Sequence, residues 1–400
     1  EALILLNNYN NKGNKLLLSK SLILLMEITC GICVANLYYI QPLESQIANT
    51  FSVSQNLVGI AAMAIQLGYA LGLLFIVPLG DMFERRSLIL HMLILVALSL
   101  IATAFSRSYF VMILAMFTIG LTTIVPQIII PYAANLSPKD QEGKVIGSVM
   151  SGLLIGILIS RTFSGIISSI FNWRIVYIFG AVFIVILFIL ILKLFPKDKP
   201  TGETFYKRLL KSIPDLIKKQ VSLRESAVNG FFMFGSFSIF WTSLIFLLET
   251  PIYNMGARET GLFGLLGVAG ALAAPLIGKI ADKKSPRFTV GIGVILSTVA
   301  YICFFVFGYH IAGLIIGVVV LDLGNQCGQV SNQARVQLLG NEARSRNNTV
   351  FMFSYFIGGA VGSFLGTFFW QSFGWYGVCI MGFVFQALAI IFHFIIYRIR

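Results

Sequence analysis

Apolar residues in this chain of 400 residues are gathered into runs that are each about as long as a lipid bilayer is thick. An α-helix needs roughly 20 apolar residues to cross the hydrocarbon, and lipid offers the backbone no hydrogen-bond partners, so such runs are helical. Only 11% of the residues are charged. We expect an all-α integral membrane protein with twelve transmembrane helices, at residues 21–41, 56–79, 88–104, 109–133, 144–167, 173–195, 224–248, 258–281, 287–307, 309–333, 347–371 and 374–397.

The basic residues test this count independently. With twelve spans the loops alternate between two sides, and all but four of the 29 Lys and Arg residues fall on the side that holds both chain ends. The exceptions are Arg107, Arg174 and Arg258 in the opposite loops and Arg161 inside a span. Basic loops stay in the cytoplasm during insertion. We therefore expect a multi-pass protein of the cell (inner) membrane with both termini cytoplasmic, and we attribute the net charge of +13 to topology and not to nucleic-acid binding.

The longest loop, at residues 196–223, follows six predicted spans and precedes six. We expect an N-terminal six-helix bundle over residues 1–195, a cytoplasmic linker over 196–223 and a C-terminal six-helix bundle over 224–400. The linker contains a basic amphipathic stretch near residues 205–217, which is typical of a segment that lies on anionic lipid headgroups. A regulatory partner site is the alternative.

The two halves carry matching residues in register. Matches 201 or 202 residues apart occur along four separate stretches, pairing Asp81 with Asp282, Gly156 with Gly358, Gln127 with Gln329, and Trp173 with Trp375. Agreement along separate spans at half the chain length indicates duplication. Two parallel repeats are typical of transporters built from two pseudo-symmetric six-helix bundles, which bind substrate near the membrane midplane.

The loop after the second predicted span keeps most of a known motif. It contains Val77, Asp81, Glu84, Arg85 and Arg86 at the defined positions of Gly-x-x-x-Asp-x-x-Gly-Arg-Arg/Lys. Through this motif, and over essentially its whole length, the chain resembles the major facilitator superfamily. Residues 36–42, 66–86 and 329–346 resemble the bacterial drug and metabolite exporters of that family.

The resemblance implies the major facilitator fold, transport activity and a cytoplasmic gate. In the family, the motif Asp caps the cytoplasmic end of the eleventh span and the basic residues bind nearby carboxylates. The expected gate residues are Asp81, Arg85, Arg86, Asp282 and Arg287. Glu84 and Glu142 are the expected carboxylate partners of the two arginines after the second span.

Two further family signatures are altered. The fourth span has Met116 where the family's proton-related Arg stands. The fifth-span antiporter motif keeps Gly152 and Gly156. Its Pro is replaced by Ile157, and its pair of glycines is replaced by Ser160 and Arg161. These departures leave import, in place of drug and proton antiport, as an alternative.

Three ionisable residues fall well inside predicted spans, away from their ends, namely Glu27, Arg161 and Asp322. A charge at the centre of a spanning helix costs roughly 2.5–3.5 kcal/mol on insertion scales, so such residues are functional by default. Arg161 needs a carboxylate, a polar cavity or an anionic substrate as its partner. We expect Glu27 and Asp322 to serve in proton coupling or substrate binding; a fixed structural role beside Arg161 is the alternative.

Polar residues also follow one face of the tenth predicted span. Asp322, Gln326, Gln329 and Gln333 are spaced 4, 3 and 4 residues apart, which places them on one side of a helix. Such a stripe faces a cavity that holds water or substrate, or it forms hydrogen bonds to other helices. We expect a central cavity lined by Asn36, Tyr38, Tyr39, Gln66, Tyr69, Gln127, Trp241, Asn325, Gln326, Gln329 and Asn332.

The sequence shows no phosphate-binding loop, catalytic triad or set of zinc ligands. We therefore expect no enzyme activity, cofactor or metal. The predicted function is secondary active transport by alternating access, with a small-molecule substrate, protons and the lipid bilayer as partners of a monomer. Proton-driven export of a drug-like molecule or metabolite is the favoured direction. A proton-coupled importer of a nutrient or metal chelate and a transporter-like receptor without transport are the alternatives.

Overall fold

The computed structural model of the protein describes residues 19–138, 141–198, 206–339 and 344–397, and every regular element within these ranges is a helix. The first half of the chain forms α2 (Lys20–Ala35), η2 (Gln41–Leu43), α3 (Glu44–Phe51), α4 (Gln55–Phe75), η3 (Val77–Asp81), α5 (Arg85–Ala104), α6 (Tyr109–Thr122), α7 (Val125–Leu136), α8 (Glu142–Ile170) and α9 (Trp173–Leu194). After the linker helix α10 (Tyr206–Lys219), the second half forms α11 (Val221–Leu248), α12 (Ala257–Phe263), η4 (Gly264–Gly267), α13 (Val268–Lys283), α14 (Pro286–Phe307), α15 (Ile311–Gln337), α16 (Arg344–Ile390) and the π-helix η6 (Ile391–Ile396).

These elements make up twelve transmembrane spans. Nine helical stretches of the described residues are long and apolar enough to cross a membrane. One of them holds two spans, because Gly374 takes φ 60° and ψ −152° and turns the chain back inside α16. The other two spans are α2, which has only 16 residues, and the pair α12 and α13, which η4 interrupts. The predicted all-α membrane fold is confirmed.

Several spans are broken where the sequence removes or loosens helical hydrogen bonds. α6 and α7 form one span whose α-helix is interrupted just before Pro126, because Pro126 has no N–H to donate. The first span loosens after Ala35 and becomes helical again at η2 and α3, so it ends near Phe51 and not at residue 41 as predicted. Between α12 and α13 a short 3₁₀ segment, η4, replaces α-helix.

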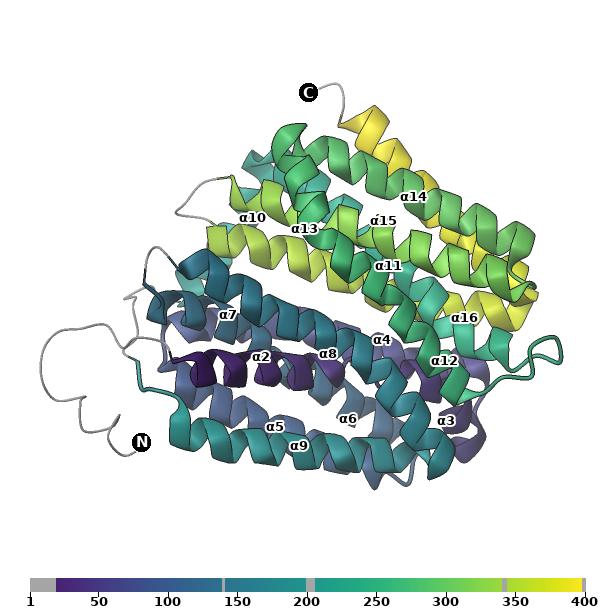
Figure 1. Ribbon diagram of the computed structural model, residues 1–400, viewed down its shortest axis with the longest axis horizontal. Helices are drawn as coiled ribbons and strands as arrows, with labels where there is room; N and C mark the ends of the chain where they lie inside the picture. Colours follow the sequence, from purple (N-terminus) through teal and green to yellow (C-terminus); the bar gives the residue numbers. More distant parts are fainter. Residues whose placement is uncertain (1–18, 139–140, 199–205, 340–343, 398–400) are drawn as a thin grey trace, which may run out of the picture.

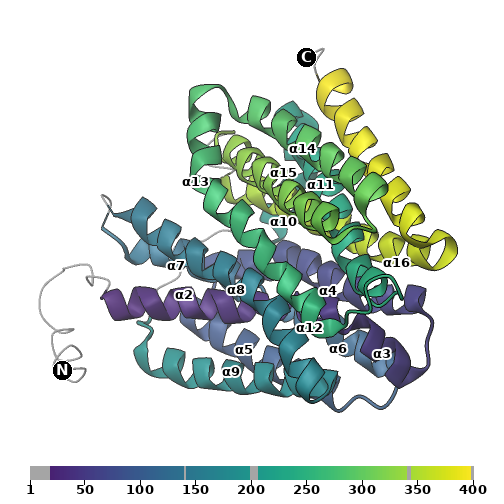
Figure 2. The same ribbon diagram turned by 45° about the vertical axis from the view of Figure 1, so that its right-hand side comes forward.

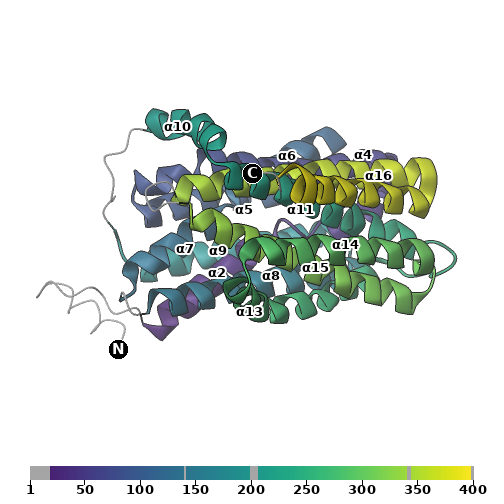
Figure 3. The same ribbon diagram turned by 90° about the horizontal axis from the view of Figure 1, so that it is seen from above.

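The two halves lie side by side, with the first half below and the second half above in Figure 1. Within the halves, α2 packs on α8, α4 on α6, α5 on α9, α11 on α16 and α14 on α15. Between them, α4 packs on α16 and α8 on α12 (Figure 2). We call the end at which α2 begins and near which α10 lies the basic end (Figure 3), and the end that holds α3 and α12 the far end (Figure 1).

The outward faces of the bundle carry large apolar side chains. Leu98 of α5, Ile189 of α9 and Val306 of α14 are 58%, 45% and 57% exposed. A protein in water does not present an apolar belt of this kind over most of its surface. These faces therefore match a lipid environment.

Glycines allow the closest helix contacts within each half. A Cβ on Gly156 would lie 2.3 Å from the Gly31 carbonyl oxygen, at the contact of α8 with α2. A Cβ on Gly362 would lie 2.1 Å from the Gly235 carbonyl oxygen, at the contact of α16 with α11. Small residues let backbones approach and pack without a hydrophobic driving force, which lipid does not provide.

We expect Gly362→Ala to lower the unfolding midpoint of the purified protein in detergent, because the added methyl group forces α16 away from α11. Overpacking of this kind costs about 1–3 kcal/mol. Gly278→Ala in α13 is the matched control, because a Cβ there would meet nothing within 4 Å. Equal midpoints for the two variants would contradict the close contact.

Candidate functional site

Arg161 of α8 is the centre of the candidate site. Its side chain is buried, at 2% exposure, and its Nε donates to Gln41 Oε1 at 2.6 Å. Its guanidinium carbon lies 4.0 Å from the ring centroid of Trp241 and 5.0 Å from that of Tyr38. Cation–π contacts of this kind gain strength when they are desolvated. The interaction joins α8 of the first half to α11 of the second.

Asp322 approaches the same region from α15. It is 7% exposed, and its Oδ2 has no hydrogen-bond partner among the described residues. The Nη2 of Arg161 is likewise unpartnered within that part of the chain. The two charges interact electrostatically without forming a direct ion pair. Each half thus contributes one charged group with a free polar atom.

The break in the eighth span lies against both charged groups. A Cβ on Gly264 would lie 2.9 Å from the Arg161 Cβ, and one on Gly267 would lie 3.5 Å from Asp322 Oδ2. Both glycines belong to η4. A Cβ on Gly267 would also lie 2.8 Å from Leu158 Cδ2, so both positions are too crowded for a larger residue.

Glu27 lies away from this pair. Its Oε1 accepts a hydrogen bond from Ser148, which stands thirteen residues before Arg161 in α8. At 1.5 Å per residue, that separation is about 20 Å along the helix. Glu27 is therefore not the partner of Arg161, although α2 and α8 pack together.

Two of the predicted cavity residues bond across the interface between α4 and the second half. Gln66 Nε2 donates to Ser363 Oγ at 2.9 Å and to Ser238 Oγ at 3.5 Å. The ring centroid of Tyr69 lies 4.4 Å from that of Phe356, and its hydroxyl accepts from Gln127 Nε2 at 3.2 Å. These contacts lie near the middle of α4.

The polar residues of α15 face two neighbours, α16 and α13. The Asn325 amide donates to the Tyr355 hydroxyl at 3.3 Å, and that hydroxyl donates to Gln329 Oε1 at 3.3 Å. Gln326 packs against Gly270 of α13. Asn332 is fully buried with no partner for its amide among the described residues.

The remaining predicted cavity residues lie inside the first half. Tyr39 contacts the rings of Phe163 and Tyr177 at centroid distances of 5.8 and 6.4 Å. Asn36 faces Gly180 of α9, whose Cβ would lie 3.5 Å from Asn36 Oδ1. Both side chains are buried between α2, α8 and α9, away from the second half.

At the basic end, the described gate arginines bond within their own halves. The Arg85 Nη1 donates to Asp198 Oδ2 at 3.2 Å, and Arg86 donates to the Leu192 carbonyl. Asp198, just after α9, is thus one carboxylate partner of Arg85, and the sequence did not suggest it. The side chains of Asp81 and Asp282 lie outside the described residues, so their gate role stays a prediction.

At the far end, hydrogen bonds join the two halves. Ser45 Oγ donates to Glu249 Oε2 at 2.5 Å, and Trp370 Nε1 donates to Gln55 Oε1 at 2.9 Å. Thr162 Oγ1 donates to the Gly261 carbonyl oxygen at 2.9 Å. Because neighbouring spans run in opposite directions, the ends of α3, α8 and α11 meet here with the start of α4. We call these contacts the far-end contacts.

We expect one far-end contact to respond to pH. Burial raises the pKa of the Glu249 carboxyl above its ordinary value, and the Ser45 hydrogen bond opposes that effect. The buried contact therefore binds a proton more tightly than an exposed Glu249 would. By linkage, low pH favours the contact, and it weakens as the pH rises through the raised pKa.

Several residues of the site could not be identified from the sequence. Tyr355 and Ser363 are ordinary residues of an apolar span. The sequence marks Ser363 only by its place in the repeat, 202 residues after Arg161. Glu44, at the start of α3, is fully buried with no partner for either carboxylate oxygen among the described residues. It stands beyond the predicted end of the first span, in a segment whose polarity is typical of a loop.

No three His, Cys, Asp or Glu side chains group into a metal site within the described part of the chain. Its five cysteines are unpaired thiols, and four of them are buried. The site thus offers charges, amides and aromatic rings for binding a solute.

The chain resembles known transporters over most of its length. A family model described as Major Facilitator Superfamily matches residues 26–337 and 226–400. A protein of Escherichia coli O157:H7 described as uncharacterized transporter YgaY is 42% identical over 365 residues, which is 91% of this chain and 93% of that protein. A protein of Mannheimia succiniciproducens described as a probable sugar efflux transporter is 24% identical and covers 78% of each chain.

Solved structures show the same fold. A mutant of the nucleoside transporter NupG superposes with a TM-score of 0.78 at 11% identity over 92% of this chain and 98% of that one. A bacterial homolog of the human lysosomal transporter Spinster superposes with a TM-score of 0.76 at 17% identity over 94% and 96%.

We expect Arg161→Gln to lower the unfolding midpoint strongly, because it leaves Asp322 buried without an opposite charge. Removing one partner of a buried charge pair costs about 3–5 kcal/mol. Adding Asp322→Asn should restore part of that loss, which a double-mutant cycle measures. As a control, Arg174→Gln removes an arginine that bonds the Ala104 and Ser106 carbonyls, and its effect should add to that of Asp322→Asn. Simple additivity in the Arg161 cycle would refute the pairing.

Proposed function

Because the chain belongs to the major facilitator superfamily and its relatives are transporters, we propose that it is a secondary active transporter that exports a small organic solute in exchange for protons. The observation that carries this proposal is the pair of buried, opposite charges at the interface of the halves. Arg161 lies in the first half and Asp322 in the second, and each has a polar atom free for a solute or a proton.

Asp322 suits competition between solute and proton. As a carboxylate, its free Oδ2 accepts hydrogen bonds from hydroxyl or amine groups of a solute. Protonation removes the charge and weakens that acceptor, so the bound solute is released. A group that either binds solute or carries a proton is what exchange requires. Arg161, although it forms no direct ion pair with Asp322, offsets the charge of the carboxylate when the solute has left.

Relatives support the outward direction, because several are described as sugar efflux transporters. A solute rich in hydroxyl groups would suit the Asp322 carboxylate, which accepts hydrogen bonds, and the amides of Gln66 and Gln326, which accept and donate them. The rings of Tyr38 and Trp241 would cover its less polar face.

The free Nη2 of Arg161 favours a second candidate function. If the solute is an anion, Arg161 binds it best when Asp322 is protonated and no longer competes for the guanidinium. Solute and proton then bind together, which is import by symport of an anionic nutrient or metal chelate. The two functions therefore differ in whether the solute and the proton compete for the site or bind together.

The far-end contacts support alternating access as the mechanism. We propose that the far end faces outward and the basic end faces the cytoplasm of the cell (inner) membrane, with both termini cytoplasmic and the protein acting as a monomer. Transport then requires the far-end contacts to break while contacts form at the basic end, where Asp81, Arg85 and Arg86 would form the gate.

The first test measures solute flux in proteoliposomes under a pH gradient, using the solute that gives the largest thermal shift in a screen of sugars, drugs and metal chelates. Asp322→Asn should abolish gradient-driven flux and leave exchange without a gradient intact. Glu27→Gln is the control and should behave like wild type, since Glu27 bonds Ser148 inside the first half.

The flux measurements distinguish export from import and test the role of Asp322. Solute movement against the proton flow supports export, and movement with it supports the importer. Wild-type coupling in Asp322→Asn would refute its role, and absence of flux for every solute that binds would count against transport itself.

A second test locks the far end. We expect the double variant Ser45→Cys/Glu249→Cys to lose flux when a short thiol crosslinker joins the new cysteines, and to regain it on reduction, because the far-end contacts must open. Each single variant, treated in the same way, should keep its flux. Full flux in the crosslinked protein would contradict alternating access through this end.

A further inference from the structure

A second cluster of charges lies in the second half of the protein, at the basic end. Glu225 of α11 accepts from Arg287 Nε of α14 at 2.9 Å and from Arg335 Nη2 of α15 at 2.5 Å. Its Oε1 lies 3.0 Å from His393 Nδ1 of η6. Arginine stays charged at any physiological pH. The cluster thus brings two fixed positive charges to one carboxylate.

The surplus positive charge reaches the surface at one side chain. The side chains of Glu225, Arg335 and His393 are 5%, 10% and 3% exposed, whereas that of Arg287 is 39% exposed. Arg287 Nη2 donates to the His393 carbonyl oxygen at 2.8 Å, which holds the guanidinium between α14 and η6. A charge that is half-buried at a membrane boundary is stabilised by an opposite charge close by.

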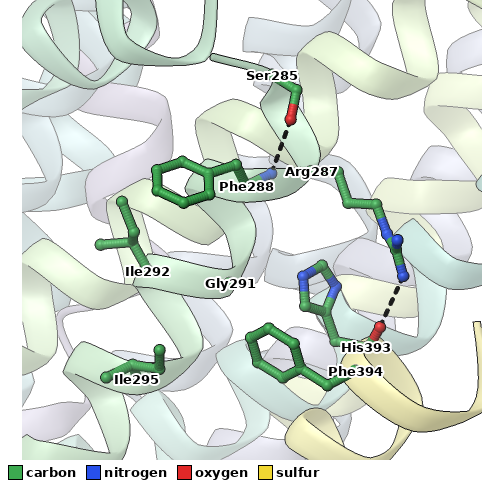
Figure 4. A pocket seen from close by; sticks show the side chains of 8 residues that line it. All are labelled: Ser285, Arg287, Phe288, Gly291, Ile292, Ile295, His393 and Phe394. Carbon is green, nitrogen blue, oxygen red and sulfur yellow. Dashed lines mark hydrogen bonds between the residues drawn. The ribbon is translucent and has the colours of Figure 1, made fainter. Parts of the chain in front are cut away.

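A cavity of about 340 Å³ opens beside Arg287, between α14 and η6 (Figure 4). We call it the α14–η6 pocket. Ser285 and Arg287 lie at the start of α14, and the pocket walls below them are apolar, formed by Phe288, Ile292, Ile295 and Phe394. Eight residues separate Arg287 from Ile295, which corresponds to about 12 Å along a helix. The pocket is polar at the membrane boundary and apolar toward the membrane interior.

This arrangement matches a lipid molecule in shape and charge. Ile295 and Phe288 are 53% and 47% exposed on the outward face of α14, where an acyl chain would lie. Lys284 lies beside the same entrance, with its Nζ 4.9 Å from the Phe288 ring centroid. Basic pockets between transmembrane helices on the cytoplasmic side attract anionic headgroups.

We propose that the α14–η6 pocket binds a phospholipid with a net negative headgroup, whose phosphate pairs with Arg287 and whose acyl chain lies along Phe288, Ile292 and Ile295. The lipid neutralises the surplus charge of the Glu225 cluster. It also bridges α14 and η6, which are the ninth and twelfth spans, and thereby stabilises the second half. A zwitterionic phospholipid leaves the surplus charge uncompensated and binds less tightly.

The test compares lipids added to delipidated protein in detergent. Dioleoylphosphatidylglycerol should raise the unfolding midpoint of wild type more than dioleoylphosphatidylcholine does, and native mass spectrometry should show the bound lipid. Both effects should be largely lost in Arg287→Gln and in Ile295→Trp. The second variant fills the apolar part of the pocket and keeps every residue of the Glu225 cluster, so it separates lipid binding from loss of the cluster's charges.

Two controls are matched to these variants. Lys279→Gln removes one positive charge from α13, and Ile302→Trp places the same large side chain two turns further along α14, at a position that is 49% exposed. Both should respond to phosphatidylglycerol as wild type does. Inorganic phosphate alone should give no shift, because it lacks the acyl chain.

The proposal is overturned by any of four results: equal shifts with the two lipids, a full shift in both pocket variants, an equal loss in Ile302→Trp, or an equal shift with inorganic phosphate. The last would assign the site to a soluble anion.

Discussion

A guanidinium buried in the membrane region is the interaction on which the centre of this protein depends. Arg161 cannot lose its proton, and hydrocarbon cannot solvate it. It is therefore enclosed by Gln41 from its own half and by Trp241 from the other, with Asp322 nearby. Because these groups come from both halves, the electrostatic stability of Arg161 depends on how the halves are placed relative to each other. That dependence is what makes the pair suited to coupling.

Close glycine packing holds helices together both within and between the halves. Within each half, glycines bring backbones together, as Gly156 does with Gly31 and Gly362 does with Gly235. Such contacts have little freedom, because the atoms that touch are main-chain atoms. Between the halves, α8 and α12 also approach through glycines, since a Cβ on Gly261 would lie 2.5 Å from the Arg161 carbonyl oxygen. Side-chain hydrogen bonds such as those of Gln66 and Ser45 add contacts that can break and re-form. The proposed rocking motion would have to separate both kinds of contact.

Most of the fold followed from the sequence because each span is a local property of its own residues. Apolar runs located the helices, and Gly374 coincided with the break between the last two spans. The end of the first span was placed too early, at residue 41, since polar residues such as Glu44 and Ser45 made residues 42–51 look like a loop. In the structure these polar side chains are buried against other helices, so their polarity did not mark an exit from the bundle.

The candidate site was only partly predictable. Arg161 and Asp322 stood out because a charge in an apolar run is costly wherever it points. The partners of such residues did not stand out, because a contact between α4 and α16 or between α5 and Asp198 joins residues far apart in the chain. The amide of Gln41 and the hydroxyl of Ser363 carry no signal until the helices are placed.

The sequence by itself determined the membrane setting, the helical class, the repeat and the two central charges, because hydropathy and the cost of burying charge are properties of single residues and short runs. The tertiary structure alone decided that Glu27 bonds Ser148 and not Arg161, that Tyr39 packs inside its own half, and that Arg287 joins Glu225 beside a pocket. Those outcomes depend on the rotation and depth of each helix, which are set by packing against its neighbours and not by its own residues.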